Sequence, residues 1–429
     1  MNYLWIYLAV MAALWWLYLT RRRRVQRKHA QQLRESMEAG LNEPASLHPV
    51  IDPQRCLGSS SCIKACPEDA LGIVDGKAVL VNGAHCIGHG ACRAACPVDA
   101  IELVFGTEKR GIDIPNVSPQ FESNVPGIFI AGELGGMGLI RKAAEQGRQA
   151  MDVIAKRSGG TFEYDVVIVG CGPAGFSAGL SAIEHRLRYK LIEQEESLGG
   201  AVFHYPRNKV AMTAPVKLAM IGKVRFGEVP KEKLLEFWQT AVRKTGLLIA
   251  FRECMEAIDR DGDGFVVRTS RGSYRTRSVL LTMGRRGTPR KLEVPGEESP
   301  KVVYRLIDPA QYAGQAVLVV GGGDSALEAA IALAEQPKTE VTLSYRSKAF
   351  SRVKGKNRDE VERLQRDQRL RVELESTVES IEPELVHLKT TGGAVALRNQ
   401  AVIVCAGGLL PTALLQRIGI LFETKHGTA

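Results

Sequence analysis

Hydrophobic positions follow three spacings along this chain of 429 residues, and each spacing predicts a different element. Short unbroken apolar runs such as Val166–Val169 and Val317–Val320 predict buried strands. From Leu139 to Ile154 apolar residues recur at i, i+3, i+4 and i+7, which predicts an amphipathic helix. A longer apolar run covers Tyr3–Leu19. The alternation of buried strands with helical segments after residue 160 predicts an α/β fold.

The run Tyr3–Leu19 contains no charged residue and is followed at once by four arginines, Arg21–Arg24. As a helix its 17 residues span about 26 Å, slightly less than a bilayer core of about 30 Å. Tyrosine and tryptophan gather at both ends, as they do at membrane interfaces. A signal peptide would instead carry positive charge before the apolar run. We therefore expect residues 3–20 to form one transmembrane helix, with the rest of the chain in the cytoplasm.

Positive charge is concentrated directly after this run. The formal net charge is +10, and six basic residues lie within residues 21–28, at the start of the predicted spacer 21–47. They are Arg21, Arg22, Arg23, Arg24, Arg27 and Lys28. Beside a membrane helix such a cluster favours contact with anionic lipid headgroups. We therefore expect membrane lipid, and not nucleic acid, to be the partner of this segment.

Six of the nine cysteines lie in two similar stretches between residues 48 and 106. The first is Cys56-x5-Cys62-x3-Cys66-Pro67, and the second is Cys86-x5-Cys92-x3-Cys96-Pro97. Both resemble the C-x2-C-x2-C-x3-C-P runs of two-cluster bacterial ferredoxins, with the second cysteine replaced. The replacements are Ser59 and His89. The resemblance implies a small α+β domain with two iron–sulfur clusters.

In such ferredoxins the last cysteine of each run binds the cluster of the other run. This rule assigns Cys56, Cys62 and Cys96 to one cluster. It assigns Cys86, Cys92 and Cys66 to the other. Three thiolates suit a [3Fe-4S] cluster, or a [4Fe-4S] cluster whose fourth iron takes His89, Ser59 or water. Zinc is the main alternative, but it usually shows paired cysteines and four ligands in one site. Disulfides fit less well beside nucleotide-binding motifs typical of the cytosol.

A glycine-rich turn follows the strand Val166–Val169 and precedes an alanine-rich helical segment. The turn consists of Gly170, Cys171, Gly172, Pro173, Ala174 and Gly175. The next predicted strand ends at Glu193. Glycines here allow the backbone to approach a pyrophosphate at the helix N-terminus, and Glu193 can bind a ribose 2′-hydroxyl. In this context the pattern predicts a dinucleotide site.

A second turn of this kind follows Val317–Val320. It consists of Gly321, Gly322, Gly323, Asp324, Ser325 and Ala326. The position that corresponds to Glu193 is Ser344, and the basic residues Arg346, Lys348 and Arg352 follow it. Arginine attracts a ribose 2′-phosphate that a carboxylate would repel, so this site favours NADP. The alternative is that these basic residues form only a solvated strand end.

The two turns, Gly199-Gly200 and Thr282-Met283-Gly284 together resemble the thioredoxin-reductase-like flavoprotein family. The resemblance covers residue 161 to the C-terminus. It implies an FAD-binding domain over 159–288, an NADPH-binding domain over 289–408 and a return to the FAD domain over 409–429. The chain has no redox-active CxxC, since Cys171, Cys254 and Cys405 are isolated. Thioredoxin reduction is therefore not expected.

In this family the chain closes with an apolar strand, a Gly-acid turn and a helix that complete the flavin site. Here the chain ends soon after Pro411, while a matching segment, Asn124–Glu133, lies before the FAD motif. We interpret residues 107–158 as this closing segment, circularly permuted to the front. Gly132 and Glu133 would then contact the flavin ribityl chain. The alternative is an ordinary extension of the ferredoxin-like domain.

These parts predict an enzyme that passes electrons between NADPH, FAD and two iron–sulfur clusters, to or from a redox partner. We expect that partner to be a protein or a quinone at the cytoplasmic membrane surface. No side chain is expected to act as a catalytic acid or base. One alternative is a low-molecular-weight disulfide reductase whose clusters are structural or sensing elements. A redox sensor without enzyme activity is the third possibility, and it would require inactive nucleotide sites.

Overall fold

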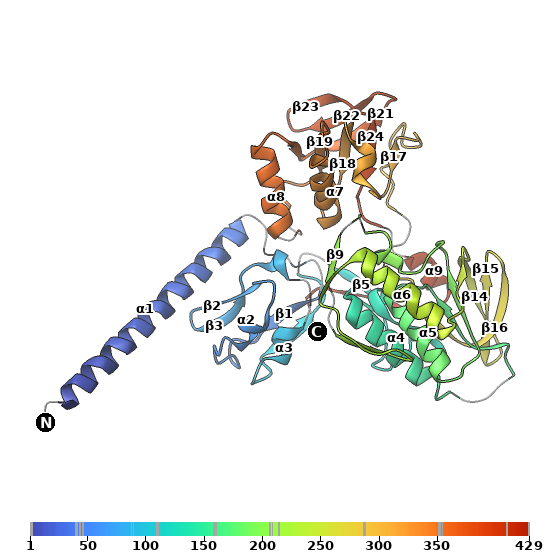
Figure 1. The fold of residues 1–429 in the computed structure, drawn as a ribbon, viewed down its shortest axis with the longest axis horizontal. Helices are drawn as coiled ribbons and strands as arrows, with labels where there is room; N and C mark the ends of the chain where they lie inside the picture. Colours follow the sequence, from blue (N-terminus) through green and yellow to red (C-terminus); the bar gives the residue numbers. More distant parts are fainter. Residues whose placement is uncertain are drawn as a thin grey trace. The chain divides into compact units, whose positions relative to one another are not determined.

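The computed structural model of the chain (Figure 1) describes most of its residues. They are residues 3–38, 42, 44, 47–86, 88, 90–108, 111–136, 138–157, 161–205, 207, 209–212, 215–285, 289–350, 353, 355–408 and 411–427. The chain forms two compact units. The first consists of Met1–Ile112, Ser347–Glu360 and Lys425–Ala429, and the second of Asp113–Arg346 and Val361–Thr424.

The first unit contains a long helix and a small α+β domain. Its elements are α1 (Tyr3–Glu38), β1 (His48–Ile51), α2 (Ser61–Ala65), β2 (Leu71–Val74), β3 (Lys77–Leu80), α3 (Ala91–Ala94) and β4 (Ile101–Val104). Strand β1 pairs antiparallel with β4, and β2 forms a hairpin with β3. Each cysteine run thus lies around one short helix that leads into a strand, as the ferredoxin resemblance implies.

Helix α1 does not end at the arginines but runs through them to Glu38. Its second half packs on the small domain, where the backbone N–H of Ile73 donates to Nδ1 of His29 at 3.0 Å. Within the part of the chain that the structure describes, no helix is long and apolar enough to cross a membrane.

The prediction of a transmembrane helix over 3–20, and of a single-pass membrane localisation, was therefore wrong. A spanning helix needs about 20 predominantly apolar residues. The run has only 17, and six of them are tyrosine or tryptophan, which carry polar groups.

The second unit is built around two sheets. The first has seven strands, in the order β13-β8-β7-β16-β15-β14, with β6 pairing β16 outside this path. Its strands are β6 (Ile128–Ile130), β7 (Tyr164–Val169), β8 (Tyr189–Glu193), β13 (Ala250–Phe251), β14 (Met255–Asp261), β15 (Gly264–Thr269) and β16 (Gly272–Leu281). Strands β6 and β7 both run parallel to the second half of β16.

Both faces of this sheet are buried, which explains its unbroken apolar strands. Helices α4 (Ile140–Ile154), α5 (Pro173–Glu184) and α6 (Lys231–Thr245) pack on one face. On the other face, buried residues of β6, β7 and β16 form one apolar cluster with α9 (Thr412–Arg417) and with residues of β14 and β15, the last two strands of the same sheet. Two hairpin-like pairs lie between α5 and α6 in sequence. They are β9 (Val210–Met212) with β12 (Glu228–Pro230), and β10 (Val216–Leu218) with β11 (Gly222–Val224).

The second sheet has five parallel strands in the order β17-β24-β18-β19-β20. They are β17 (Val302–Val303), β18 (Ala316–Val320), β19 (Glu340–Tyr345), β20 (Leu370–Leu374) and β24 (Ala401–Val404). Helix α7 (Asp324–Ala334) packs on this sheet. An antiparallel meander follows, with β21 (Thr377–Ile381), β22 (Leu385–Thr390) and β23 (Gly393–Arg398). The predicted α/β class with two dinucleotide-type sheets is confirmed.

Three elements have residues in both units: β5 (Ile112–Pro115), α8 (Gly355–Arg366) and β25 (Phe422–Lys425). The stretch Ser347–Glu360, which the sequence places within the second nucleotide domain, belongs to the unit of the cysteine runs. This stretch is grouped with the cysteine runs because it packs against them: a Cβ on Gly355 would lie only 2.1 Å from Nε2 of His85.

Candidate functional site

The first glycine turn is closely packed where β7 passes into α5. A Cβ on Gly175 would lie 1.8 Å from the carbonyl oxygen of Gly170 and 2.6 Å from Oγ1 of Thr282. That hydroxyl donates to the carbonyl oxygens of Val169 and Gly170, at 2.9 and 2.8 Å. Gly170 itself has φ 97°, which favours glycine. The sequence motifs around Gly170 and Thr282 therefore form one structure.

A second pair of glycines lies opposite this turn. Gly199 and Gly200 have φ 118° and 52°, and Gly199 donates its N–H to the carbonyl oxygen of Cys171 at 2.9 Å. Among the described residues, a Cβ on Gly172 would meet only the Cα of Gly200, at 3.9 Å. Two bare backbone segments thus face each other at the N-terminus of α5. This cradle fits a pyrophosphate, which helix N–H groups bind.

Glu193 ends β8 beneath the turn and is only 5% exposed. Its carboxylate accepts the N–H of Cys171 at 2.6 Å and that of Glu195 at 3.0 Å. Burial raises the pKa of Glu193 above its ordinary value, and the two backbone N–H groups offset only part of this effect. Cys171 is completely buried, and this burial raises its pKa well above the ordinary value. Glu193 is thus held at the end of β8, where it would meet a ribose, while Cys171 has a packing position.

Strand β6 brings Gly132 and Glu133 to the same site. It pairs with Val279–Leu281 of β16, and a Cβ on Gly132 would lie 2.9 Å from the Cβ of Ala174. Gly132 has φ 83° and donates its N–H to Oε1 of Gln146 at 2.9 Å. The strand therefore lies against the FAD-type sheet, as expected from the sequence.

The carboxylate of Glu133 lies beside Gly284, where an added Cβ would be 3.8 Å from Oε2. Its basic neighbour is Arg285, which the sequence analysis did not identify. Burial lowers the pKa of Arg285, and Glu133 counteracts this shift. Arg285 also donates to the carbonyl oxygen of Asp113 at 2.8 Å. In the sequence, the one feature that could have pointed to Arg285 as a site residue is its position directly after Thr282-Met283-Gly284.

The C-terminal segment lies next to the stretch before β6, as the interpretation of residues 107–158 requires. The side chain of Asn124 donates to the carbonyl oxygen of Gly419 at 2.8 Å and accepts the N–H of Leu421 at 2.9 Å. The backbone of Leu421 in turn accepts the N–H of Asn116 at 2.8 Å. Segments about 300 positions apart in sequence are therefore joined side by side within one domain.

The second glycine turn lies where β18 passes into α7. Gly321 has φ 144°, and a Cβ on it would lie 2.5 Å from the carbonyl oxygen of Cys405. Gly322 is covered by the ring of Tyr345, which an added Cβ would approach to 2.2 Å. A Cβ on Gly323, in contrast, would meet no atom within 4 Å among the described residues. The cradle is therefore open directly before α7, whose first turn contains Asp324, Ser325 and Ala326.

No acidic side chain follows β19 in the position of Glu193. Ser344 is completely buried and shares a hydrogen bond of 2.7 Å with the hydroxyl of Ser376. Arg346 is exposed directly after the strand, and Arg352 lies outside the described residues. Of the two arginines in this pattern, Arg346 is the one that the structure describes, and its position suits a ribose 2′-phosphate.

The six clustered cysteines line two separate cavities in the small domain. Cys56, Cys62 and Cys96 line the first, together with Ser59. Cys66, Cys86 and Cys92 line the second, together with Gly88 and Gly90. This is the grouping that the crossing rule of two-cluster ferredoxins predicts. His89 lies outside the described residues.

Three of the six thiols around these cavities are buried, the other three are partly buried, and backbone N–H groups donate to two of the six. Ala78 donates to Sγ of Cys56 at 3.5 Å, and Ala100 donates to Sγ of Cys96 at 3.3 Å. Burial raises the pKa of Cys62 and of Cys92, and it raises the pKa of Cys86 to about 11. Thiolates at such positions require a nearby cation.

The thiols surround a volume rather than a point. Across the described part of the chain, no three His, Cys, Asp or Glu side chains converge closely enough to hold a single metal ion. Each cradle instead leaves a cavity between three sulfur atoms. Apolar walls, sulfur ligands and N–H groups directed at sulfur fit an iron–sulfur cluster, and the structure thus favours it over zinc.

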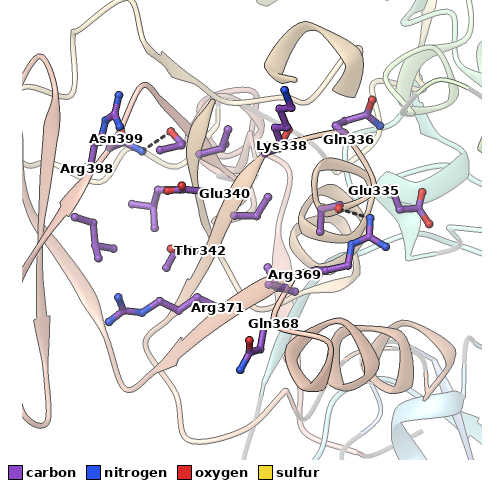
Figure 2. Close-up of a pocket in the computed structure, with 18 of the residues that line it drawn as sticks. Glu335, Gln336, Lys338, Glu340, Thr342, Gln368, Arg369, Arg371, Arg398 and Asn399 are labelled. Carbon is purple, nitrogen blue, oxygen red and sulfur yellow. Dashed lines mark hydrogen bonds between the residues drawn. The ribbon is translucent and has the colours of Figure 1, made fainter. Parts of the chain in front are cut away.

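A further cavity lies elsewhere, at the starts of β18, β19 and β20 (Figure 2). It measures about 580 Å³ and is lined by side chains of both charges, among them Lys338, Glu340, Arg371 and Arg398. Nucleotides bind such sheets at the carboxyl ends of the strands, which is the opposite end. None of the predicted site residues in the described chain lines this cavity.

Comparison with known proteins places these sites in a family. Residues 167–428 match the family described as pyridine nucleotide-disulphide oxidoreductase, and residues 48–97 match a 4Fe-4S dicluster domain. Among curated proteins, the ferredoxin–NADP reductase of Pediococcus pentosaceus is 33% identical over 52% of this chain and 62% of its own length. The bacilliredoxin reductase Bdr of Bacillus subtilis is 26% identical over 61% of this chain and 82% of its own length.

A solved structure gives the same fold. The bacillithiol disulfide reductase Bdr (YpdA) of Staphylococcus aureus superimposes with a TM-score of 0.55 at 21% identity, covering 60% of this chain and 83% of its own. The chain spans 62% and 55% of the first two curated relatives it matches, so it covers less than two thirds of each. From its family match and its sites, this chain belongs to the pyridine nucleotide-disulphide oxidoreductase family, with FAD and NADP as nucleotide cofactors, and it carries a 4Fe-4S dicluster domain before the matched region.

Proposed function

We propose that this protein is an NADPH-dependent flavoprotein oxidoreductase that passes electrons between NADPH, FAD and two iron–sulfur clusters, to or from an electron-carrier protein. The observation that carries the proposal is the crossed grouping of six thiols around two cavities, in a chain that also has two dinucleotide turns. Bound flavin exchanges two electrons with nicotinamide and single electrons with clusters. A chain with both kinds of site is suited to convert between the two.

The residues of the first domain bind and orient. The Gly170–Gly175 turn and the N-terminus of α5 would hold the FAD pyrophosphate, with Glu193 at the adenosine ribose. Glu133 would accept a hydrogen bond from the ribityl chain. Arg285 lies beside it, and the charge of Glu133 partly offsets the lowering of the Arg285 pKa by burial.

In the second domain, the Gly321–Gly323 turn would hold the NADPH pyrophosphate at the N-terminus of α7. Arg346 would bind the 2′-phosphate, since a planar guanidinium suits this group. No proton transfer by a side chain is required in either domain.

We further propose that residues 107–158 are the circularly permuted closing segment of the flavin domain. Two observations support this. Strand β6 adds to the sheet beside β16, and the segment after Pro411 is hydrogen-bonded to residues 113–124. Without β6 this sheet would have an open edge next to the cofactor. The permutation also places the cysteine runs directly before the flavin domain in sequence.

The partner that fits best is a one-electron carrier protein, and either direction of electron flow is compatible with the sites. Curated relatives described as ferredoxin–NADP reductases support this class of partner. Their names apply to those proteins, and a cluster domain in this chain adds a route for single electrons.

The second candidate is a low-molecular-weight disulfide reductase, which the similarity to the proteins named Bdr favours. Its chemistry needs an accessible thiol or an exposed flavin face. Cys171, the cysteine of the FAD turn, is completely buried, and its pKa is raised well above the ordinary value by that burial. It is therefore unsuited to attack a disulfide.

An anaerobic assay separates the two functions. The full chain is reduced with NADPH and offered a ferredoxin, a cytochrome, a quinone or a low-molecular-weight disulfide. The control replaces Cys56 and Cys86 by serine, which removes one thiolate from each cradle. We expect carrier reduction to be lost in this variant while NADPH still bleaches the flavin. Disulfide turnover that is unaffected by the variant would instead support the second candidate.

A further inference from the structure

The cavity of the first cluster has one wall without a thiol. Cys56 and Cys62 are each only 7% exposed, and Cys96 lies across the cavity from the other run. Ser59 and Ser60 are the residues with side-chain oxygens among those that line the cavity, and Ser59 is exposed. Ser59 lies three positions after Cys56 and three before Cys62. It therefore occupies the place of the missing fourth ligand.

The Ser59 hydroxyl is a poor substitute for a thiolate. It is neutral at ordinary pH and harder than sulfur, whereas soft thiolates select iron–sulfur clusters. It also has a competing partner, because it lies 3.3 Å from Oγ of Ser61 and 3.5 Å from the Ser61 N–H. An iron at this corner would be held by the cluster sulfides and by no protein thiolate. The exposure of Ser59 opens this corner to solvent.

We propose that the first cluster has a single exchangeable iron at the Ser59 corner of its cradle. Release of one Fe²⁺ from a [4Fe-4S]²⁺ cluster leaves a [3Fe-4S]⁺ cluster and one electron, which a one-electron oxidant accepts. The three thiolate–iron bonds are kept, and Fe²⁺ together with one electron from a reductant restores the fourth iron. The first cluster is thereby a site that responds to ferrous iron and to oxidant. This inference rests on the proposed cluster ligands and not on the identity of the electron carrier.

The test compares the reconstituted full chain with the variant Ser59→Cys, which restores the fourth thiolate. Each protein receives stoichiometric ferricyanide under anaerobic conditions, followed by measurement of iron, sulfide and the EPR signal of an oxidised three-iron cluster. We expect Ser59→Cys to retain about one iron per chain more than the wild type and to give a smaller three-iron signal. Ser61→Ala, which leaves position 59 unchanged, should behave like the wild type. Fe²⁺ with dithionite should return the lost iron to the wild type.

Equal iron loss from the wild type and from Ser59→Cys would overturn the inference, because the labile iron would then lie at the other cluster. A second variant, Ser59→Ala, covers the case in which the added cysteine disturbs the loop. It should still assemble the cluster and lose the same iron as the wild type. Failure of Ser59→Ala to assemble the first cluster would also overturn the inference, since Ser59 would then be an essential ligand. A protein that takes up no iron at all would instead reject the proposed function.

Discussion

The carbonyl oxygen of Ala174 lies 2.1 Å from the point that a Cβ on Gly147 would occupy. Gly147 is on α4, in the segment before the FAD motif, while Ala174 is in the first turn of α5. The two helices therefore pack backbone to backbone at the pyrophosphate turn. The segment 107–158 therefore contacts the FAD domain in two ways, through this helix contact and through the pairing of β6 with β16.

Replacing Gly147 by alanine should therefore separate α4 from the FAD turn. In an ordinary helix the change would stabilise by about 0.5–1 kcal/mol. Here overpacking against a rigid carbonyl should cost about 1–3 kcal/mol or more, so the net effect is destabilising. We expect less bound flavin and a lower unfolding temperature. Gly227→Ala is the control, because a Cβ there meets no atom of the described residues within 4 Å and φ is not positive. A Gly147→Ala protein with full flavin content would contradict this packing.

Replacing Arg346 by alanine should weaken NADPH binding by about 1–3 kcal/mol, because a charge-assisted contact with the 2′-phosphate is lost. NADH binding should hardly change, since NADH lacks this phosphate. Anaerobic titration of flavin reduction with each nucleotide measures the difference. Arg398→Ala, an exposed arginine at the end of β23, is the matched control. If both nucleotides bind equally less well to Arg346→Ala, this residue does not contact the phosphate.

Replacing Glu133 by glutamine should raise the dissociation constant of FAD roughly tenfold, or about 1.4 kcal/mol. The amide is a weaker acceptor for the ribityl chain, and Arg285 loses the nearby negative charge. Glu133→Asp should keep more affinity, because it keeps the carboxylate. Fluorescence of released flavin during dilution measures the effect, with Glu145→Gln on α4 as control. Unchanged affinity in Glu133→Gln would remove Glu133 from the site.

Glu253 gives the flavin domain a stability that depends on pH. It is 2% exposed, and its Oε1 accepts the hydroxyls of Thr269 and Tyr274, each at 2.6 Å, while Lys190 lies 3.5 Å from Oε2. Burial raises its pKa, but these hydrogen bonds and Lys190 outweigh burial, so the net pKa is lowered. A lowered pKa contributes stability above the unfolded value and loses it as pH falls through the folded value.

The variant Glu253→Gln should therefore be less stable than the wild type by about 1–3 kcal/mol at pH 7. The difference should shrink below about pH 4.5, the ordinary range of a glutamate, as the wild type becomes protonated. Urea unfolding at several pH values measures it, with the exposed Glu256→Gln as control. A difference that is constant down to pH 3 would show that the charge of Glu253 does not contribute.

The sequence determined the local chemistry of this protein. Both glycine turns, the acid at the end of β8 and the serine near the end of β19 could be predicted from motifs, since a dinucleotide turn needs bare backbone within a few consecutive residues. The grouping of the six cysteines around two cavities followed from the resemblance to two-cluster ferredoxins, in which the last cysteine of each run joins the other run. The position of β6 followed from its resemblance to a family segment.

Only the tertiary structure decided what depends on contacts between distant segments. The proximity of Arg285 to Glu133 and of Gly147 to Ala174 joins residues whose separation in sequence carries no periodic signal. Helix α1 continues through Arg21–Arg24 to Glu38. The run before these arginines was predicted to span a membrane because it has no charged residue, but its tyrosines and tryptophans make it too polar for that. The contact of Gly355 with His85 arises from packing within one unit, and packing is set by shape and burial rather than by local sequence.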